Sequence, residues 1–276
     1  MANFTAADIK ALREQTAAGM LDVKKALEEA DGDMTKAAEI LRIKGLKGVT
    51  KREGRSALNG LVAAVAGDGV GTLVEVSCET DFVAKGERFI ALAEQVLAQA
   101  VAIKAADAQA LLDSTLPDGR TVTDLLTDGS AATGEKIEVR RVARVEGERV
   151  VAYLHRTARD LPPQIGVLLA TIGGDEQTAR DVAMHVAAFS PTVLARDEVA
   201  EDVVANERRI AEATAREEGK PEAALPRIIE GRVNGYFKEN VLLDQAFAKD
   251  QKKSVAQVLT EAGAQATGFA RFRVGN

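Results

Sequence analysis

The sequence has few of the residues that most often carry chemistry. Cys78 is the single cysteine, tryptophan is absent, and the histidines are His155 and His185. One cysteine excludes an intramolecular disulfide and favours a reducing compartment. Neither histidine has metal-ligand spacing with the other or with Cys78, so we expect no metal site and no cofactor. With 46% hydrophobic residues, the chain has enough apolar surface to fold without such cross-links.

Long apolar runs are also missing. A membrane helix needs roughly 18 to 20 consecutive apolar residues, and no stretch approaches this length. Residues 1–8 have neither the basic start nor the apolar segment of a signal peptide. These features predict a cytoplasmic protein without a membrane partner.

The chain has no excess of positive charge. Its net charge of −6 argues against a protein whose main task is binding nucleic acid, which needs concentrated Lys and Arg. A local basic cluster does occur between residues 42 and 55, formed by Arg42, Lys44, Lys47, Lys51, Arg52 and Arg55. It is typical of a solvated helix end and linker, and the alternative is a contact with RNA.

Motifs for hydrolysis or nucleotide binding are missing as well. There is no Gly-x-Ser-x-Gly elbow and no Gly-x-x-x-x-Gly-Lys-[Ser/Thr] loop. The glycine-rich residues 67–72 precede a strand-like run, whereas a phosphate loop precedes a helix. We therefore interpret them as a turn, and expect a binding or regulatory protein rather than an enzyme.

The first half of the chain changes from helical to extended periodicity. Residues 5–44 predict three short helices, with a capping box at Thr5 and Asp8 and a stop at Gly45. Two strand-like runs, 61–66 and 70–78, flank Gly-Asp-Gly, which is typical of a hairpin. A helix follows, whose apolar positions share one face: Phe89, Ala93, Val96, Leu97 and Ala100.

The same order then recurs. Residues 149–156 and 165–172 predict a second strand pair, 175–189 predict a second helix, and 136–145 form a strand-like run between the two units. Short links between strands indicate antiparallel sheets, so the expected fold is α+β with two related core subdomains.

The last part of the chain is predicted to contain an insertion. Two amphipathic segments within 198–240 are separated by Gly219-Lys220-Pro221, which indicates a projecting antiparallel helical hairpin. A helix and a strand complete the chain, and the strand is expected to rejoin the second sheet. The predicted units are a helical module with basic linker (1–55), core subdomain N (56–140), core subdomain C (141–193 and 243–276) and the inserted hairpin (194–242).

Two stretches resemble the signatures of the elongation factor Ts family. They are Leu-Arg-Glu-Gln-Thr-Ala-Ala-Gly-Met-Leu-Asp-Val-Lys-Lys-Ala-Leu at 12–27 and Glu-Val-Ser-Cys-Glu-Thr-Asp-Phe-Val-Ala-Lys at 75–85. Shorter similarities follow in the family's order at 41–45, 183–188, 230–232 and 268–272. The resemblance spans nearly the whole chain.

This resemblance implies a fold and a function. The fold would combine a ubiquitin-associated-like three-helix module, a two-subdomain α+β core and an inserted helical hairpin. The function would be guanine-nucleotide exchange on elongation factor Tu, with possible heteromeric assembly through the hairpin and no direct nucleic-acid contact. By resemblance, Thr80, Asp81, Phe82 and Val83 displace Mg²⁺ from the partner, and the partner-binding residues are Lys24, Lys25, Lys51, Gly134 and His155.

The residues alone leave simpler interpretations open. Asp81 precedes a helical run and fits a helix N-cap. Phe82 lies seven residues before Phe89 and fits an apolar staple between helix and hairpin. Lys24 and Lys25 fit a solvated helix face. Alternative functions are an RNA-binding ribosome accessory that uses residues 42–55, and a ubiquitin-associated-like adaptor without exchange activity.

Overall fold

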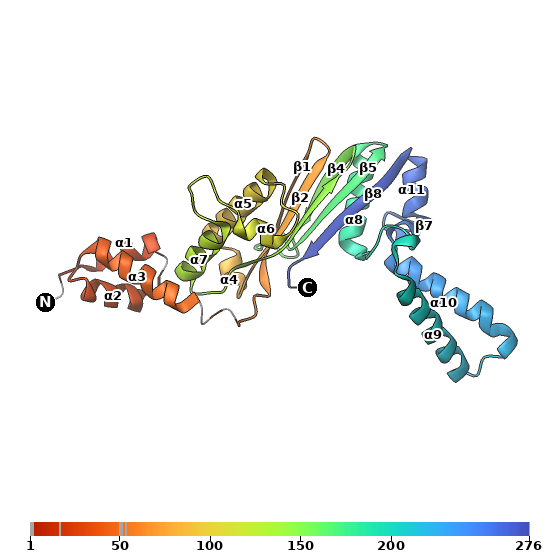
Figure 1. Ribbon diagram of the computed structural model, residues 1–276, viewed down its shortest axis with the longest axis horizontal. Coiled ribbons are helices and arrows are strands. Elements are labelled where there is room, and N and C mark those ends of the chain that lie inside the picture. The colour runs from red at the N-terminus through yellow and green to blue at the C-terminus, as the bar shows by residue number, and fades with distance from the viewer. Residues whose placement is uncertain (1–2, 17, 50–51, 53, 276) are drawn as a thin grey trace.

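The protein is elongated, with a helical module at one end and a helical hairpin at the other (Figure 1). The computed structural model describes residues 3–16, 18–49, 52 and 54–275, with backbone alone over 46–49. Between the two ends lies a core of two three-stranded antiparallel sheets. The α+β fold predicted from the sequence is confirmed, including both sheets and the inserted hairpin. No helix in the described part of the chain is long and apolar enough to cross a membrane.

The helical module consists of α1 (Ala6–Thr16), α2 (Met20–Glu29) and α3 (Met34–Val49). Its start is the predicted capping box, because the Thr5 amide donates to Asp8 Oδ2 at 2.7 Å and the Asp8 amide donates to Thr5 Oγ1 at 3.3 Å. The three helices share a small core formed by Leu12, Val23, Ala26, Leu27, Ala30, Ala37 and Leu41. Whether the module is ubiquitin-associated-like stays a prediction.

Helix α3 continues past Gly45, so the predicted stop at that residue is wrong. A Cβ on Gly45 would lie 2.9 Å from the Ala131 Cβ, closer than real Cβ atoms approach. Glycine is therefore required here for close packing rather than for ending the helix. Through this contact the module docks on α7 (Val122–Thr133) of the core.

The first sheet has the order β1-β2-β3, formed by β1 (Asn59–Gly67), β2 (Val70–Cys78) and β3 (Glu138–Glu146). Asp68 and Gly69 connect β1 to β2 with φ of 49° and 74°, the two positive values of a tight hairpin turn. Strand β3 pairs with β2 from Ser77 to Val70, so the expected subdomain boundary at residue 140 falls inside a strand of the first sheet.

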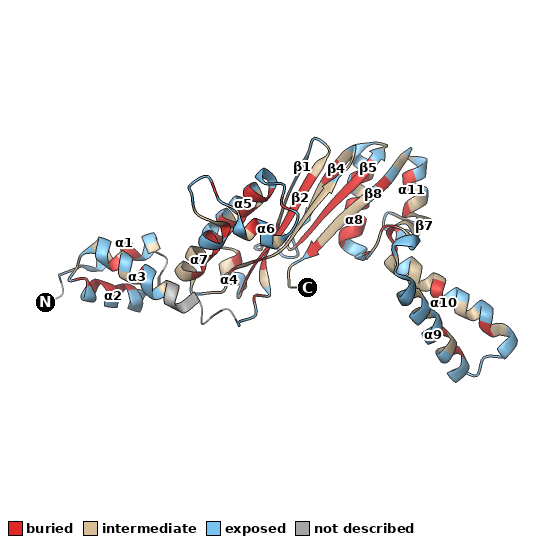
Figure 2. Ribbon diagram, in the orientation of Figure 1, coloured by how far each residue is buried: buried red, intermediate tan, exposed pale blue. Residues whose placement is uncertain are grey.

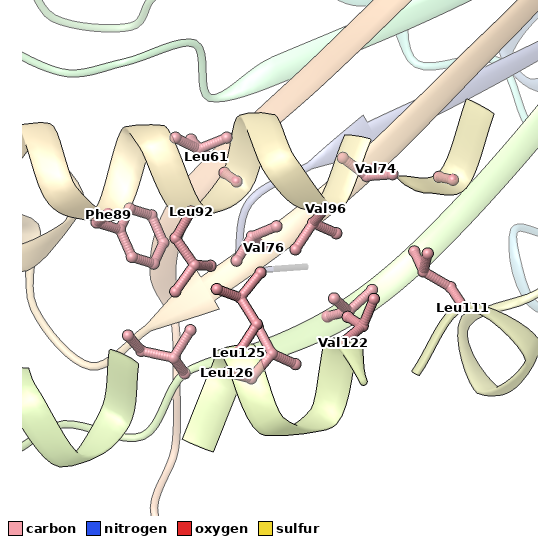
Figure 3. Packing of buried hydrophobic residues seen from close by; sticks show 14 of the residues in the cluster. Leu61, Val74, Val76, Phe89, Leu92, Val96, Leu111, Val122, Leu125 and Leu126 are labelled. Carbon is pink, nitrogen blue, oxygen red and sulfur yellow. The ribbon is translucent and has the colours of Figure 1, made fainter. Parts of the chain in front are cut away.

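Three helices cover the outer face of this sheet: α5 (Glu87–Ala102), α6 (Ala108–Asp113) and α7. Apolar side chains from the sheet and the helices meet in one core (Figure 3). It includes Leu61, Val74, Val76, Phe89, Leu92, Val96, Leu111, Val122, Leu125 and Leu126. The apolar spacing of the sequence predicts α5 but neither α6 nor α7.

The second sheet has the order β4-β5-β8, formed by β4 (Arg149–His155), β5 (Ile165–Gly173) and β8 (Ala264–Arg273). Strand β8 pairs with β5, so the last strand rejoins the second sheet as predicted. Helices α8 (Glu176–Phe189) and α11 (Val255–Glu261) pack against this sheet in a second core. A two-stranded ribbon precedes α11, formed by β6 (Ala246–Phe247) and β7 (Asp250–Ser254).

The two sheets pack face to face, so their central strands are largely buried (Figure 2). Val62 and Leu73 of the first sheet meet Leu168 and Phe272 of the second. An ion pair of the first sheet lies at this interface. Arg141 Nε donates to Glu75 Oε2 at 2.6 Å, and Glu75 is fully buried. The Arg141 guanidinium also lies 4.6 Å from the centre of the Phe272 ring.

The inserted hairpin consists of α9 (Glu201–Glu217) and α10 (Leu225–Asn240), which project away from the core (Figure 1). Gly219, with φ of 69°, allows the turn after α9. Both helices are mostly exposed, and their contact buries a narrow set of residues: Ala211, Ala215, Leu225 and Val233.

Candidate functional site

The Thr-Asp-Phe-Val motif forms a short turn of helix directly after strand β2. Helix α4 (Asp81–Ala84) begins after Thr80, whose Oγ1 accepts a hydrogen bond from the Val83 amide at 3.3 Å. Thr80 is therefore the N-cap, and the interpretation of Asp81 as the cap is wrong. Both residue types can cap a helix, but only Thr80 has the extended backbone that a cap needs. We call residues 80–83 the tip.

Phe82 points away from the protein. It is 83% exposed, more than any other large apolar side chain that the structure describes. The interpretation of Phe82 as a staple is wrong, because α4 ends at Ala84 and a new helix starts at Glu87, so Phe82 and Phe89 do not share a helix face. Phe89 is buried, and Val83 packs partly against the first core. The tip is thus anchored to the core through Val83 and presents the apolar ring of Phe82 to solvent.

A carboxylate distant in sequence holds the tip. Glu135 Oε2 accepts hydrogen bonds from the amides of Glu79 and Thr80, each at 3.0 Å, and Glu135 Oε1 accepts one from the Thr80 hydroxyl at 2.6 Å. In return, Glu79 Oε1 accepts a bond from the Lys136 amide at 2.7 Å. Gly134 precedes Glu135 and ends α7 in the left-handed region, with φ of 78°.

Lys85 connects the tip to the second subdomain. Its ammonium lies 2.9 Å from Asp81 Oδ2 and also 2.9 Å from Asp160 Oδ2 in the loop between β4 and β5. The hydrogen bond from Lys85 lowers the pKa of Asp81, and the bond to Asp81 raises the pKa of Lys85. Asp81 therefore carries a negative charge beside Phe82 at neutral pH.

The basic cluster makes contacts within the chain. Arg42 pairs with Asp128 at 3.3 Å, Lys44 with Glu29 at 2.5 Å, and Arg55 with Glu79 at 3.3 Å. Arg52 Nη1 donates to the Ser130 carbonyl at 3.1 Å. The predicted site residue Lys51 lies outside the described residues. Arg42, Arg52 and Arg55 thus attach the module and its linker to the core, whereas Lys44 pairs with α2 inside the module. These contacts weigh against the RNA contact.

The predicted residues of α2 lie on the exposed side of the module. Lys24 and Lys25 are exposed, and Lys24 approaches Glu28 within 3.8 Å. Beside them, Met20 and Leu21 are 60% and 73% exposed. These two apolar residues were not among the predicted site residues. The exposure of Leu21 could have been predicted, because Leu21 does not fall on the helix face formed by the buried residues of α2, which starts at Val23.

His155 lies apart from the tip, at the end of β4. It is exposed, and its Nδ1 is 3.2 Å from the Tyr153 hydroxyl. Together with Met184 and Arg271 it lines a cavity of about 350 Å³ on the second subdomain. The structure therefore brings Thr80–Val83 and the Gly134 turn together, and leaves the α2 lysines and His155 on separate surfaces.

Comparisons with known proteins support the resemblance. The sequence profile of the family described as elongation factor TS matches residues 79–276. Elongation factor Ts from Renibacterium salmoninarum is 62% identical over 278 residues, and that from Micrococcus luteus is 62% identical over 279 residues. Each alignment covers 100% of this chain and 100% of the relative. Elongation factor Ts from Acidothermus cellulolyticus is 61% identical, with 100% of this chain and 99% of the relative covered. The profile match and the identity to these relatives each show that this chain belongs to the elongation factor Ts family.

Proposed function

We propose that the protein is the guanine-nucleotide exchange factor of elongation factor Tu. It binds elongation factor Tu with GDP in the cytoplasm, displaces Mg²⁺ and promotes the release of GDP and its exchange for GTP. The single observation that carries this proposal is the tip, which presents an exposed phenyl ring and an ionised carboxylate on a fixed turn. The family consists of nucleotide exchange factors, which act by binding rather than by chemistry of their own.

Phe82 supplies the apolar wedge in this proposal. Transferring a phenylalanine side chain from water into a protein contact contributes about 1.5 to 3 kcal/mol. That free energy can favour a rearranged partner only if the rearranged form buries the ring better than the GDP-bound form does. Asp81 brings a negative charge to the same place, where it competes with the anionic ligands of a cation.

Thermodynamic linkage explains why such a wedge releases nucleotide. If the exchange factor lowers the affinity of the partner for GDP, then GDP lowers the affinity of the partner for the exchange factor by the same factor. The exchange factor is displaced when nucleotide returns, and the cycle closes as GTP binds. No covalent step is required of this chain.

Other surfaces are proposed to hold the partner while the tip acts. The module offers Met20 and Leu21 as apolar contacts, with Lys24 and Lys25 beside them. On the second subdomain, His155 borders the cavity described above. Lys51 and Gly134 complete the proposed partner-binding set, and the projecting hairpin provides a surface for assembly into larger heteromers.

The exchange assay tests this function directly. Purified elongation factor Tu is loaded with a fluorescent GDP, and its release is followed after a stoichiometric amount of this protein is added with excess unlabelled GDP. We expect at least a tenfold acceleration at millimolar Mg²⁺. When EDTA has already removed Mg²⁺, the protein should accelerate release much less. No acceleration at any Mg²⁺ concentration would refute the function, and an equal acceleration with EDTA would refute the displacement of Mg²⁺.

The RNA-binding alternative predicts a different result. Binding of labelled RNA would be strong at low salt and would weaken steeply as salt rises, because phosphate contacts release counterions. We expect weak binding, since Arg42, Lys44 and Arg55 are paired with carboxylates. Binding in the nanomolar range at physiological salt would contradict this expectation.

A further inference from the structure

We propose that Glu135 is a positioning residue for nucleotide exchange, because its carboxylate fixes the direction in which the tip presents Phe82. This inference rests on the function proposed above and assigns a role to a residue that the family motif does not include. Glu135 is 55 positions from Thr80 in the chain, yet it accepts three hydrogen bonds from Glu79 and Thr80. These hydrogen bonds come from the residues before Phe82 and not from Phe82 itself.

The three bonds fix the backbone of the tip at the point where β2 becomes α4. The two amides donate to one carboxylate oxygen and the Thr80 hydroxyl donates to the other, so both oxygens are engaged. The same hydroxyl oxygen caps α4 by accepting the Val83 amide. Glu135 thus orients the cap, and the cap orients the helical turn that carries Phe82. Hydrogen bonds to an ionised acceptor are stronger than those between neutral groups.

Glu135 is itself held in place from three sides. The Ser130 hydroxyl donates to the Glu135 carbonyl at 2.5 Å, and the Lys136 amide donates to Glu79 Oε1 at 2.7 Å. The positive φ of Gly134 turns the chain out of α7 immediately before Glu135. Gly134 keeps its place in the proposed partner-binding set, and its backbone geometry also sets the position of Glu135. A residue with a Cβ would be strained at this φ.

Glu135 is half-buried, and its bond with the Glu79 amide is part-buried. Its bonds with Thr80 are exposed, and Glu135 is not a member of the apolar clusters that stabilise the described part of the chain. When the carboxylate is removed, water can reach the freed Thr80 amide. We therefore expect loss of tip orientation without a comparable loss of folding.

Two substitutions separate positioning from folding. Glu135→Ala removes all three acceptor bonds, whereas Glu135→Gln keeps a carbonyl oxygen for the two amides and an amide group opposite the Thr80 hydroxyl. We expect Glu135→Ala to lower the maximal rate of assisted GDP release about tenfold with KM changed less than twofold, because the other docking surfaces are intact. Glu135→Gln should retain at least a third of the wild-type rate. Glu138→Ala, which removes a nearby carboxylate paired with Lys136, is the matched control and should behave as wild type.

Two further measurements test whether Glu135 acts through the tip. In the free protein, the amide resonances of Glu79 and Thr80 should shift upfield in Glu135→Ala, and the order parameters of residues 80–83 should fall. In a Phe82→Ala background, adding Glu135→Ala should change the exchange rate less than twofold, because the oriented ring is already gone. Unchanged amide resonances, a full tenfold loss in the Phe82→Ala background, or wild-type exchange by Glu135→Ala would overturn the proposal. If the wild-type protein accelerates no exchange, the function fails, while the resonance measurement still decides whether Glu135 holds the tip.

Discussion

Two phenylalanines seven residues apart should respond in opposite ways to the same substitution. Phe82 is 83% exposed and Phe89 is 2% exposed. Phe82→Ala removes a ring of which only about a sixth is covered, so the lost burial is worth roughly 0.3 to 0.5 kcal/mol. Alanine also favours the helix over phenylalanine by a few tenths of a kcal/mol. The net change in the free energy of unfolding should stay within about 0.5 kcal/mol.

Phe89→Ala removes a ring from the core between the first sheet and α5 (Figure 3). Burial is lost and a cavity remains, which together cost about 3 to 5 kcal/mol for a phenylalanine in a packed core. Urea unfolding followed by circular dichroism at 222 nm measures both variants against wild type. A loss above about 1.5 kcal/mol for Phe82→Ala would show that the ring supports the fold, and a harmless Phe89→Ala would show that the core is misassigned.

Three further predictions concern buried polar groups. Burial lowers the pKa of His185, whose Nδ1 accepts a bond from the Ala248 amide at 3.1 Å. The histidine therefore binds a proton more readily in the unfolded chain than in the folded protein. The free energy of unfolding, measured with urea, should fall by at most about 1.4 kcal/mol per pH unit as the pH drops below ~6.5. His185→Gln should remove this pH dependence. Burial raises the pKa of the Cys78 thiol to about 12, so the native thiol should not react with Ellman's reagent at pH 8 within hours, whereas the urea-unfolded chain should react in minutes. Arg141→Met should cost about 3 kcal/mol in urea unfolding because it leaves the Glu75 carboxylate buried without its partner, and adding Glu75→Leu should restore most of that stability.

Elements with a clear period could be predicted from the sequence. The hairpin at Asp68 and Gly69, helix α5, helix α8 and the two helices of the insertion combine regular apolar spacing with strong turn or stop residues. Helices α6 and α7 could not be predicted in this way. Helix α6 has only six residues, too few to establish a period, and α7 contains Gly129 and four threonine or serine residues, which weaken a helical pattern.

Contacts between distant residues could not be predicted from local patterns. Gly45 is a residue type that often ends a helix. Only its contact in space with Ala131 shows that glycine is needed here for close packing. Thr80 and Asp81 are both good capping residues, and the backbone conformation decides between them. The family motif identified the tip. Glu135, which contacts Thr80 from 55 residues away, and Asp160, which contacts Lys85 from 75 residues away, have no local signal.

The proposed role of the tip is tested most directly by the rate of GDP release from elongation factor Tu with Phe82→Ala. The matched control is Ile172→Ala, which removes another exposed apolar side chain. Ile172 is 48% exposed and lies at the opposite end of strand β5 from Ile165 and from the loop whose Asp160 contacts Lys85. We expect Phe82→Ala to slow assisted release at least tenfold while its unfolding free energy stays within about 0.5 kcal/mol of wild type. Ile172→Ala should exchange nucleotide at the wild-type rate. Wild-type exchange by a correctly folded Phe82→Ala would show that the Phe82 ring does not drive nucleotide release.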